Sequence, residues 1–128
     1  MEVKQISVFL ENRNGQLKEV TKILADNNID IEALNIAETA EYGIVRLIVD
    51  NVQKAIDALI GDGFIISVNP VTVCNVPNVV GSLNRVLDKI AEANINIEYM
   101  YSIFGGKNAE SKMVFKSDDP DLLKKVIG

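Results

Sequence analysis

The sequence predicts an α+β protein made of two tandem ferredoxin-like units, each with the order β-α-β-β-α-β, antiparallel sheets and helices on one face. Two observations lead to this fold class. The chain repeats itself after 66 residues, and each copy alternates between strand-like and helix-like hydrophobic periods. The second copy stops before its last strand. We therefore expect one unit over residues 1–69 and a second, incomplete one over residues 70–128.

The repeat is clearest when residues 15–34 are placed over residues 81–100. Eight of these twenty positions are identical: Gly15/Gly81, Leu17/Leu83, Val20/Val86, Ala25/Ala91, Asn28/Asn94, Ile29/Ile95, Ile31/Ile97 and Glu32/Glu98. With one extra residue in the hairpin of the second copy, residues 55–61 align with residues 122–128. The two copies are therefore predicted to share one fold.

The first copy contains all six elements. Residues 4–10 alternate in polarity like a strand, and the apolar residues of 17–27 recur at helical spacing. Residues 29–38 and 43–50 are predicted to form a hairpin. Residues 52–60 follow as a second amphipathic helix, and residues 64–68 return as a strand.

The second copy follows the same order up to its second helix. Residues 71–76 are a strand that follows directly on the strand at 64–68, residues 82–94 are a helix, and residues 95–104 and 110–117 are strands. Ser117 or Asp118 is predicted to cap the last helix, with Pro120 in its first turn. The chain then reaches Gly128, which aligns with Gly61. Either the chain is cut short there or another chain completes the sheet, and we favour the first explanation.

Composition and charge limit the function. The chain has 128 residues, of which 48% are hydrophobic and 24% charged, with a net charge of -5 and a pI near 4.7. Nucleic acids and anionic membranes would repel such a protein, so we expect neither as a partner. The uncharged stretch 63–84 contains prolines and asparagines and is not a membrane helix. We expect a cytoplasmic protein.

The residue types also argue against catalysis. The chain has no histidine, and no serine, lysine or carboxylate has a base partner that the sequence identifies. We expect no enzyme activity, no metal and no cofactor. The single cysteine, Cys74, lies in an apolar strand, where we interpret it as a buried hydrophobic residue rather than a reactive thiol.

The frame N-x-x-G-x-L occurs twice, at residues 12–17 and 78–83, each time at the start of a predicted helix. Glycine permits an unusual backbone angle there, and the first turn of a helix presents unpaired N–H groups that suit a carboxylate. The asparagine can serve either half of an amino-acid zwitterion. The alternative is that both frames are only structural turns, since a duplication copies those as well.

The stretch ENRNGQL at 11–17, followed by NNIDIEALNIAE at 27–38, resembles the ACT domains of amino-acid-responsive enzymes. The resemblance extends over nearly the whole chain, as a tandem ACT-domain protein, and is more specific in the first half. It implies an amino-acid-binding regulatory module. The ligand would lie where the loop of one unit meets the start of the second strand of its neighbour.

The resemblance also implies the ligand-binding residues. Leu10 and Val76 stand where some serine-binding members have histidine, so we expect an apolar amino acid. Asp30 replaces an asparagine at the start of the second strand and keeps an acceptor for an ammonium group. The full set of candidates is Leu10, Asn12, Asn14, Gly15, Leu17, Asp30, Val76, Asn78, Gly81, Leu83 and Asn96.

We expect a stand-alone amino-acid sensor, dimeric with a second copy, that acts in trans on a metabolic enzyme or through its own oligomer. Two alternatives remain. One is a structural dimerisation module without ligand binding. The other is a small acyl-phosphate hydrolase on the same fold, although the sequence lacks the anion-binding arginine loop that this activity needs.

Overall fold

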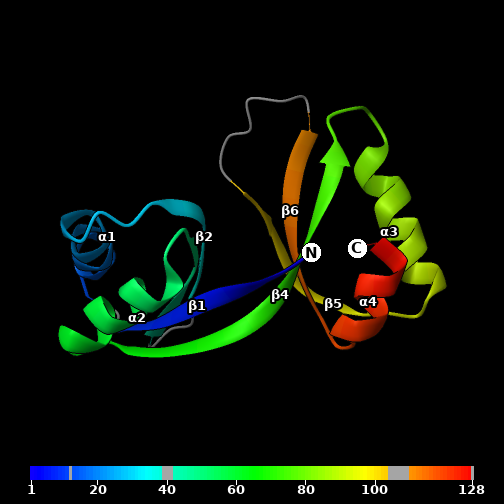
Figure 1. Ribbon diagram of the computed structural model, residues 1–128. Helices are drawn as coiled ribbons and strands as arrows, with labels where there is room; N and C mark the ends of the chain where they lie inside the picture. Colours follow the sequence, from blue (N-terminus) through cyan, green and yellow to red (C-terminus); the bar gives the residue numbers. More distant parts are fainter. Residues whose placement is uncertain (12, 39–41, 104–109, 128) are drawn as a thin grey trace. The chain divides into compact units, whose positions relative to one another are not determined.

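The computed structural model describes residues 1–11, 13–38, 42–103 and 110–127 and divides the chain into two compact units (Figure 1). The first unit comprises Lys4–Asn69. The second unit combines Met1–Val3 with Pro70–Gly128. Within the described ranges, no helix is both long and apolar enough to cross a membrane.

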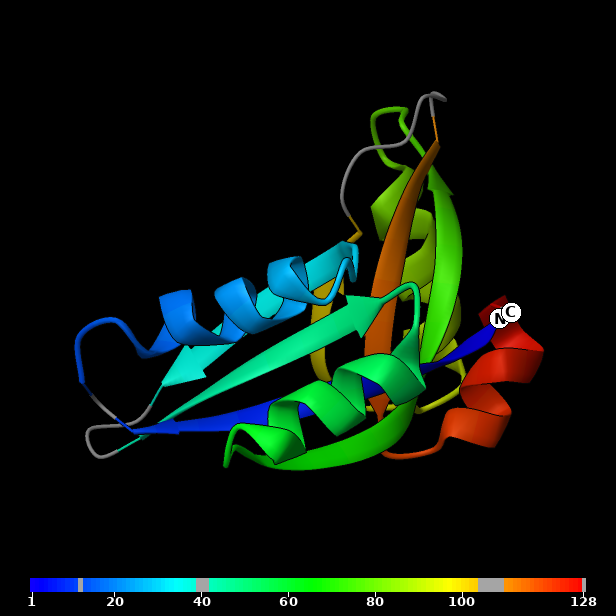
Figure 2. The same cartoon turned by 60° about the vertical axis from the view of Figure 1, so that its left-hand side comes forward.

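The first unit has the predicted order of elements. They are β1 (Glu2–Glu11), α1 (Gln16–Asp26), β2 (Ile31–Glu38), β3 (Tyr42–Val49), α2 (Val52–Gly61) and the beginning of β4 (Ile65–Pro77). Both β1 and β2 pair antiparallel with β3. Alternate residues of β1 and β3 share one core with the apolar sides of α1 and α2, so both helices cover the same face of the strands (Figure 2).

Local sequence sets the ends of these helices. Gly15, with φ 86°, precedes α1 in the left-handed conformation that glycine adopts without strain. Asn28, with φ 56°, follows the last turn of α1 and redirects the chain towards β2. The side chain of Asn51 accepts a hydrogen bond from the backbone N–H of Lys54 at 3.1 Å and so caps α2.

The second unit repeats this arrangement. Its elements are the end of β4, then α3 (Ser82–Glu92), β5 (Ile97–Ser102), β6 (Glu110–Ser117) and α4 (Pro120–Ile127). Both β4 and β5 pair antiparallel with β6. Phe115 of β6, Ile90 of α3 and Leu123 of α4 are almost fully buried in one core. Each copy of the repeat thus builds its own hydrophobic centre.

The cap of α4 differs from the prediction. Pro120 is the first residue of the helix, as expected, but Asp119 is the capping residue: its carboxylate accepts the N–H of Leu122 at 3.1 Å. The prediction of Ser117 or Asp118 was wrong. The carboxylate of Asp118 instead accepts the backbone N–H of Asn96 at 3.0 Å and joins the start of β5 to the end of β6.

Strand register corrects the alignment of the two copies. Val8 lies opposite Val45 in the first unit. In the second unit Cys74 lies opposite Met113. Positions 8 and 74 differ by 66, whereas positions 45 and 113 differ by 68. The second hairpin therefore contains two extra residues, and the predicted alignment with one extra residue was wrong.

The strand β4 crosses the division between the two units, as β1 does between Val3 and Lys4. The sequence predicted two consecutive strands at 64–68 and 71–76, but β4 runs without a break over Ile65–Pro77. The division between the units falls within it, between Asn69 and Pro70. Proline removes one backbone donor, but its fixed φ is compatible with an extended chain, so the strand continues through it.

The N-terminus occupies the position beside β4 where the repeat would place the last strand of the second unit. Met1 and Val73 exchange two backbone hydrogen bonds, at 3.0 Å and 2.6 Å, as in an antiparallel pair. The strand order is β2-β3-β1-β4-β6-β5, so β4 has β1 on the side away from β6. The exposed edge that the sequence implied beside residues 71–76 is therefore covered by Met1–Val3, an arrangement that neither of our two explanations included.

Cys74 is buried, as the sequence predicts, with 7% of its surface exposed. Burial raises the pKa of its thiol, although the charges of the N-terminal ammonium and Lys89 act in the opposite direction. The sulfur therefore remains a neutral thiol within the core of the second unit.

Candidate functional site

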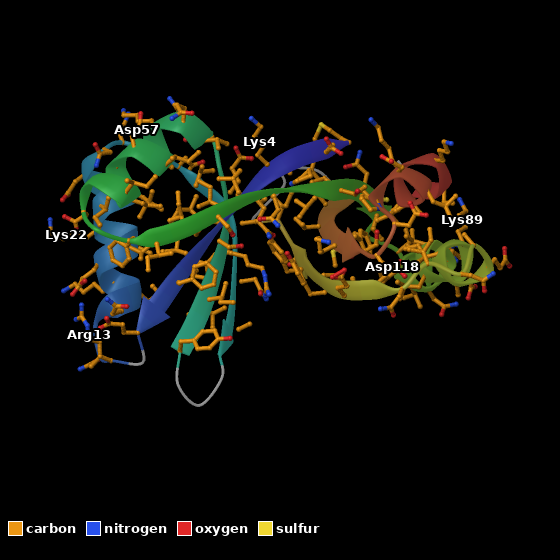
Figure 3. All side chains as sticks on the ribbon, turned by 90° about the horizontal axis from the view of Figure 1, so that it is seen from below. Lys4, Arg13, Lys22, Asp57, Lys89 and Asp118 are labelled. Atoms are coloured by element: carbon orange, nitrogen blue, oxygen red, sulfur yellow. The ribbon has the colours of Figure 1, made fainter. Side chains whose placement is uncertain are left out.

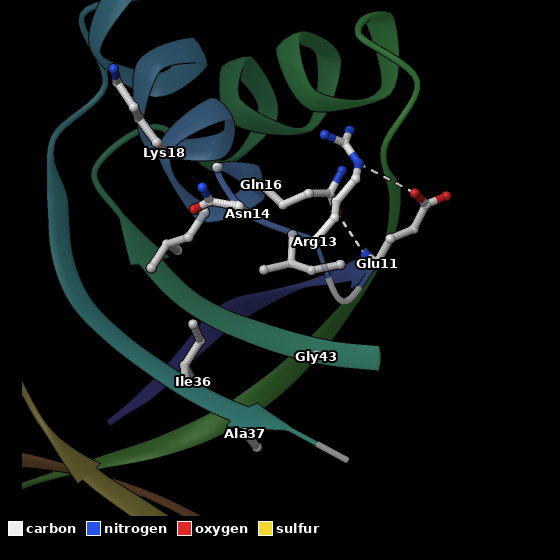
Figure 4. Close-up of a pocket in the computed structure, with 11 residues that line it drawn as sticks. Glu11, Arg13, Asn14, Gln16, Lys18, Ile36, Ala37 and Gly43 are labelled. Atoms are coloured by element: carbon white, nitrogen blue, oxygen red, sulfur yellow. Dashed lines mark hydrogen bonds and ion pairs between the residues drawn. The ribbon is translucent and has the colours of Figure 1, made fainter. Parts of the chain in front are cut away.

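The first unit has a pocket at the end where α1 begins (Figure 4). Its volume is about 440 Å³, and it lies between the loop after β1, the first turn of α1, and parts of β2 and β3. The lining residues are Leu10, Glu11, Arg13, Asn14, Gly15, Gln16, Leu17, Lys18, Ile36, Ala37 and Gly43.

The second unit has a pocket at the start of α3, with a volume of about 370 Å³. The loop after β4, the first turn of α3 and β6 form its walls. The lining residues are Val76, Pro77, Asn78, Val79, Gly81, Leu83, Asn84, Ser111 and Met113.

The two pockets are equivalent under the repeat. With offsets of 66 before the hairpin and 68 after it, seven of the nine residues that line the second pocket correspond to residues that line the first. Gly15 and Gly81 are equivalent, each in the left-handed conformation, and among the described residues no side chain caps either helix start. The backbone N–H groups of both first turns therefore lie beside a pocket, and that of Ser82 donates to the carbonyl of Val79 at 3.0 Å.

Most of the predicted ligand-binding residues lie at these pockets. The first pocket includes Leu10, Asn14, Gly15 and Leu17. The second includes Val76, Asn78, Gly81 and Leu83. Asn12 lies outside the described residues.

The two remaining candidates, Asp30 and Asn96, line neither pocket. The backbone N–H of Asp30 donates to the carboxylate of Asp50, which follows β3, whereas Gly43 near the start of β3 lines the first pocket. At a rise of about 3.3 Å per residue, the two ends of β3 are roughly 20 Å apart. The backbone N–H of Asn96 likewise donates to the carboxylate of Asp118, which follows β6. Within one unit, therefore, neither residue meets the loop.

Side-chain contacts organise the loop of the first pocket. The buried amide of Gln16 accepts the backbone N–H of Glu11 at 2.7 Å. Arg13, labelled in Figure 3, contacts Glu19 at 3.2 Å and Glu11 at 3.4 Å. The hydrogen bond to Glu19 is the main cause of the raised pKa of Arg13. The guanidinium group of Arg13 thus forms ion pairs with two carboxylates.

The loop of the second pocket is organised differently. Pro77 stands at the position of Glu11 and has no N–H to donate. The hydroxyl of Ser82, at the position of Gln16, accepts a hydrogen bond from Nη2 of Arg85 at 3.1 Å. A Cβ atom at Gly81 would lie 3.1 Å from Nη1 of Arg85, so the guanidinium lies directly beside this glycine.

The linings also differ in charge. The first pocket has three charged lining residues, Glu11, Arg13 and Lys18. The corresponding residues of the second pocket are uncharged: Pro77, Val79 and Asn84. Val79 and its neighbour Val80 are 65% and 98% exposed. The second loop is therefore the more apolar of the two.

The sequence analysis did not identify the pocket-lining residues that come from strands distant in sequence from the loops. Ile36 and Gly43 reach the first pocket from β2 and β3, and Ser111 and Met113 reach the second from β6. Gly43, Ser111 and Met113 belong to no motif, and Ile36 lies within the stretch at 27–38 but was not among the predicted ligand-binding residues. Only the pairing of Leu10 with Gly43 and of Val76 with Ser111 brings them to the loops.

Comparison with known proteins identifies related chains. A model of the ACT domain pair family matches residues 1–128. Protein BT0572 from Bacteroides thetaiotaomicron is 40% identical, with a TM-score of 0.91 over 98% of this chain and 86% of that chain. No curated protein sequence matches.

Two further structures share the fold. The ligand-free regulatory subunit of aspartate kinase from Thermus thermophilus is 15% identical, with a TM-score of 0.65 over 96% of this chain and 89% of that chain. The corresponding subunit from Thermus flavus is 13% identical, with a TM-score of 0.60 over 90% and 84% of the two chains. At this level of identity the likeness concerns the fold alone.

Proposed function

Because the chain belongs to the ACT domain pair family, we propose that it is a regulatory protein that binds a free amino acid. The observation that carries this proposal is the pair of equivalent pockets, each beside an uncapped helix start. The first-turn N–H groups suit the ligand carboxylate. The amides of Asn14 and Asn78, which line the two pockets, offer an acceptor to its ammonium group.

The proposed ligand has an apolar side chain. Leu10 and Val76 line the pockets at equivalent positions, and Leu17 and Leu83 add further apolar surface. A polar ligand side chain would lose its hydrogen bonds to water against these residues without gaining others. We therefore expect a response to an apolar amino acid rather than to serine.

The proposed action is in trans. Binding would change the affinity of the chain for an enzyme of amino-acid metabolism, or for a second copy of itself. The regulatory subunits of aspartate kinase that share this fold support the choice of an enzyme in amino-acid metabolism. Support for a second copy comes from β2 and β5, which are the outermost strands in the sheet order.

Thermal unfolding with each of the twenty amino acids tests the proposal. A ligand at a hundred times its dissociation constant should add about 2.7 kcal/mol to the free energy of unfolding. Asn14→Ala and Asn78→Ala should reduce that gain, whereas Asn75→Ala, an exposed amide on β4 outside the pockets, should not. The absence of any response, with a concentration-dependent oligomer, would instead favour a structural dimerisation module.

A further inference from the structure

Asparagine is followed by glycine at one place in the sequence, Asn14–Gly15. The backbone nitrogen of the residue after an asparagine can attack the Cγ atom of the asparagine side chain and displace its amide nitrogen. Glycine permits this attack because it has no Cβ atom in the path and because its backbone has wide conformational freedom. The pair therefore has the composition that deamidation within the chain requires.

The structure places this pair where the reaction has room. Asn14 and Gly15 are both exposed in the turn between β1 and α1, and both line the first pocket (Figure 4). A Cβ atom at Gly15 would meet no described atom within 4 Å. The peptide group between the two residues is thus accessible to the solvent base that starts the reaction and to the water that completes it.

The position before α1 also favours the first step. The attacking nitrogen of Gly15 must lose its proton and so acquires negative charge. A helix N-terminus carries partial positive charge, which stabilises an anion next to it. Gly15 directly precedes Gln16, the first residue of α1. The fold therefore adds an electrostatic contribution to the reactivity that the sequence provides.

The reaction consumes only water. A bond forms between the nitrogen of Gly15 and Cγ of Asn14, the proton of that nitrogen passes to solvent, and the side-chain amide leaves as ammonia after it gains a proton. Water then opens the cyclic imide at either carbonyl. The products are ammonium and a chain with aspartate or isoaspartate at this position, which carries one more negative charge.

The second unit supplies a comparison within the same chain. Val80–Gly81 occupies the equivalent position, with Gly81 in the same left-handed conformation before α3 and Val80 98% exposed. Valine has no side-chain amide, so this turn cannot react. Asn78 of the second pocket precedes Val79, whose branched Cβ atom hinders the attack. The reactive arrangement is therefore confined to the first pocket.

We propose that Asn14 is a site of spontaneous deamidation, and that a ligand in the first pocket slows this reaction. A bound molecule covers the lining residue Asn14 and restricts the turn that must move for its side chain to meet the nitrogen of Gly15. The modification itself does not depend on the proposed function. The protection by ligand does rest on it, because it requires an amino acid in this pocket.

Incubation of the full chain in mildly alkaline buffer tests the modification, with peptide mass spectrometry and isoelectric focusing as readouts. A more acidic species should accumulate, and its change in mass should map to Asn14. Glycine as the next residue should make this site react about tenfold or more faster than the exposed Asn75, which precedes valine. Equal rates at the two sites would overturn the proposal. Asp62–Gly63 can form the same imide, but its hydrolysis restores the original mass and charge.

Matched variants test whether this turn is responsible. Asn14→Gln, which would have to close a larger ring, should abolish the acidic species. Val80→Asn should create a second one, because it places asparagine before the left-handed Gly81 of the other unit. An acidic species that persists in Asn14→Gln, or no reaction in Val80→Asn, would contradict the assignment. Circular dichroism confirms that each variant is folded.

Leucine is the probe for protection by a ligand. At a hundred times its dissociation constant, about one pocket in a hundred stays empty, so the reaction at Asn14 should slow by about tenfold or more. Leucine that binds in isothermal titration without slowing the reaction would overturn the protection. Deamidation in a chain to which no amino acid binds would leave the modification site standing while the proposed function fails. Amino-acid binding by a chain that does not deamidate would do the reverse.

Discussion

Oε1 of Gln16 lies 2.7 Å from the backbone nitrogen of Glu11 and accepts its hydrogen bond. Gln16 is the first residue of α1, and only 8% of its surface is exposed. In the second unit the equivalent pair is Ser82 and Pro77, and proline has no N–H that needs an acceptor. The side chain of Gln16 thus satisfies a backbone donor at Glu11. The loop of the second unit has no such donor, and there the shorter Ser82 stands at the same position.

Replacing Gln16 with alanine should lower the free energy of unfolding by about 1 to 3 kcal/mol, because the N–H of Glu11 loses its acceptor. Urea unfolding measures the change. Gln53→Ala is the control: this exposed glutamine donates a hydrogen bond to the exposed Asp57, so its loss should stay within about 0.5 kcal/mol. Equal effects of the two variants would contradict the structural role of Gln16.

Deleting Glu2 and Val3 should destabilise the second unit, although these residues precede the first. The deletion removes the strand that covers β4, and with it the two hydrogen bonds between Met1 and Val73. Hydrogen exchange at the Val73 amide should accelerate more than exchange at Ile29, whose N–H bonds to Leu24 inside the first unit. Unchanged protection at Val73 would mean that Met1–Val3 does not complete this sheet.

Alanine at Gly15 or Gly81 should cost about 1 to 2 kcal/mol, because both glycines have a left-handed backbone, at φ 86° and 88°. Their effects on stability should differ in size. A Cβ atom at Gly81 would displace the guanidinium of Arg85, whereas one at Gly15 meets no atom within 4 Å. Urea unfolding should therefore show a greater loss of stability for Gly81→Ala, and the extra loss should disappear in an Arg85→Gln background.

Cys74 should react with thiol reagents only when the second unit opens. Burial raises the pKa of its thiol above the ordinary value of 9.0. Since the folded state holds the proton more tightly, its contribution to stability is complete below pH 9 and is lost as the pH rises towards the folded pKa. Stability measured against pH should fall less steeply above pH 9 in Cys74→Ala. Rapid labelling of the folded protein at pH 8 would contradict this placement.

Much of the fold follows from local pattern. Apolar residues at helical spacing, such as Val20 and Leu24 of α1, and the glycine before each first helix predict where helices begin and which face they bury. Eight identities between the copies predict that both share one fold. The frames around Gly15 and Gly81 likewise predict the half of each pocket that comes from the loop and helix, since those residues are neighbours in the chain.

The tertiary structure decided what depends on strand pairing. Cross-strand register set the second hairpin at two extra residues, brought Gly43 and Ser111 to the loops, and placed Asp30 and Asn96 at the far ends of their units. It also brought Met1 beside Val73, 72 residues away in sequence. The period of the hydrophobic residues identifies a strand and its buried face, but it does not identify the strand with which it pairs. Every pair of strands forms the same kind of backbone hydrogen bonds, so only the packing of the whole core selects one pairing.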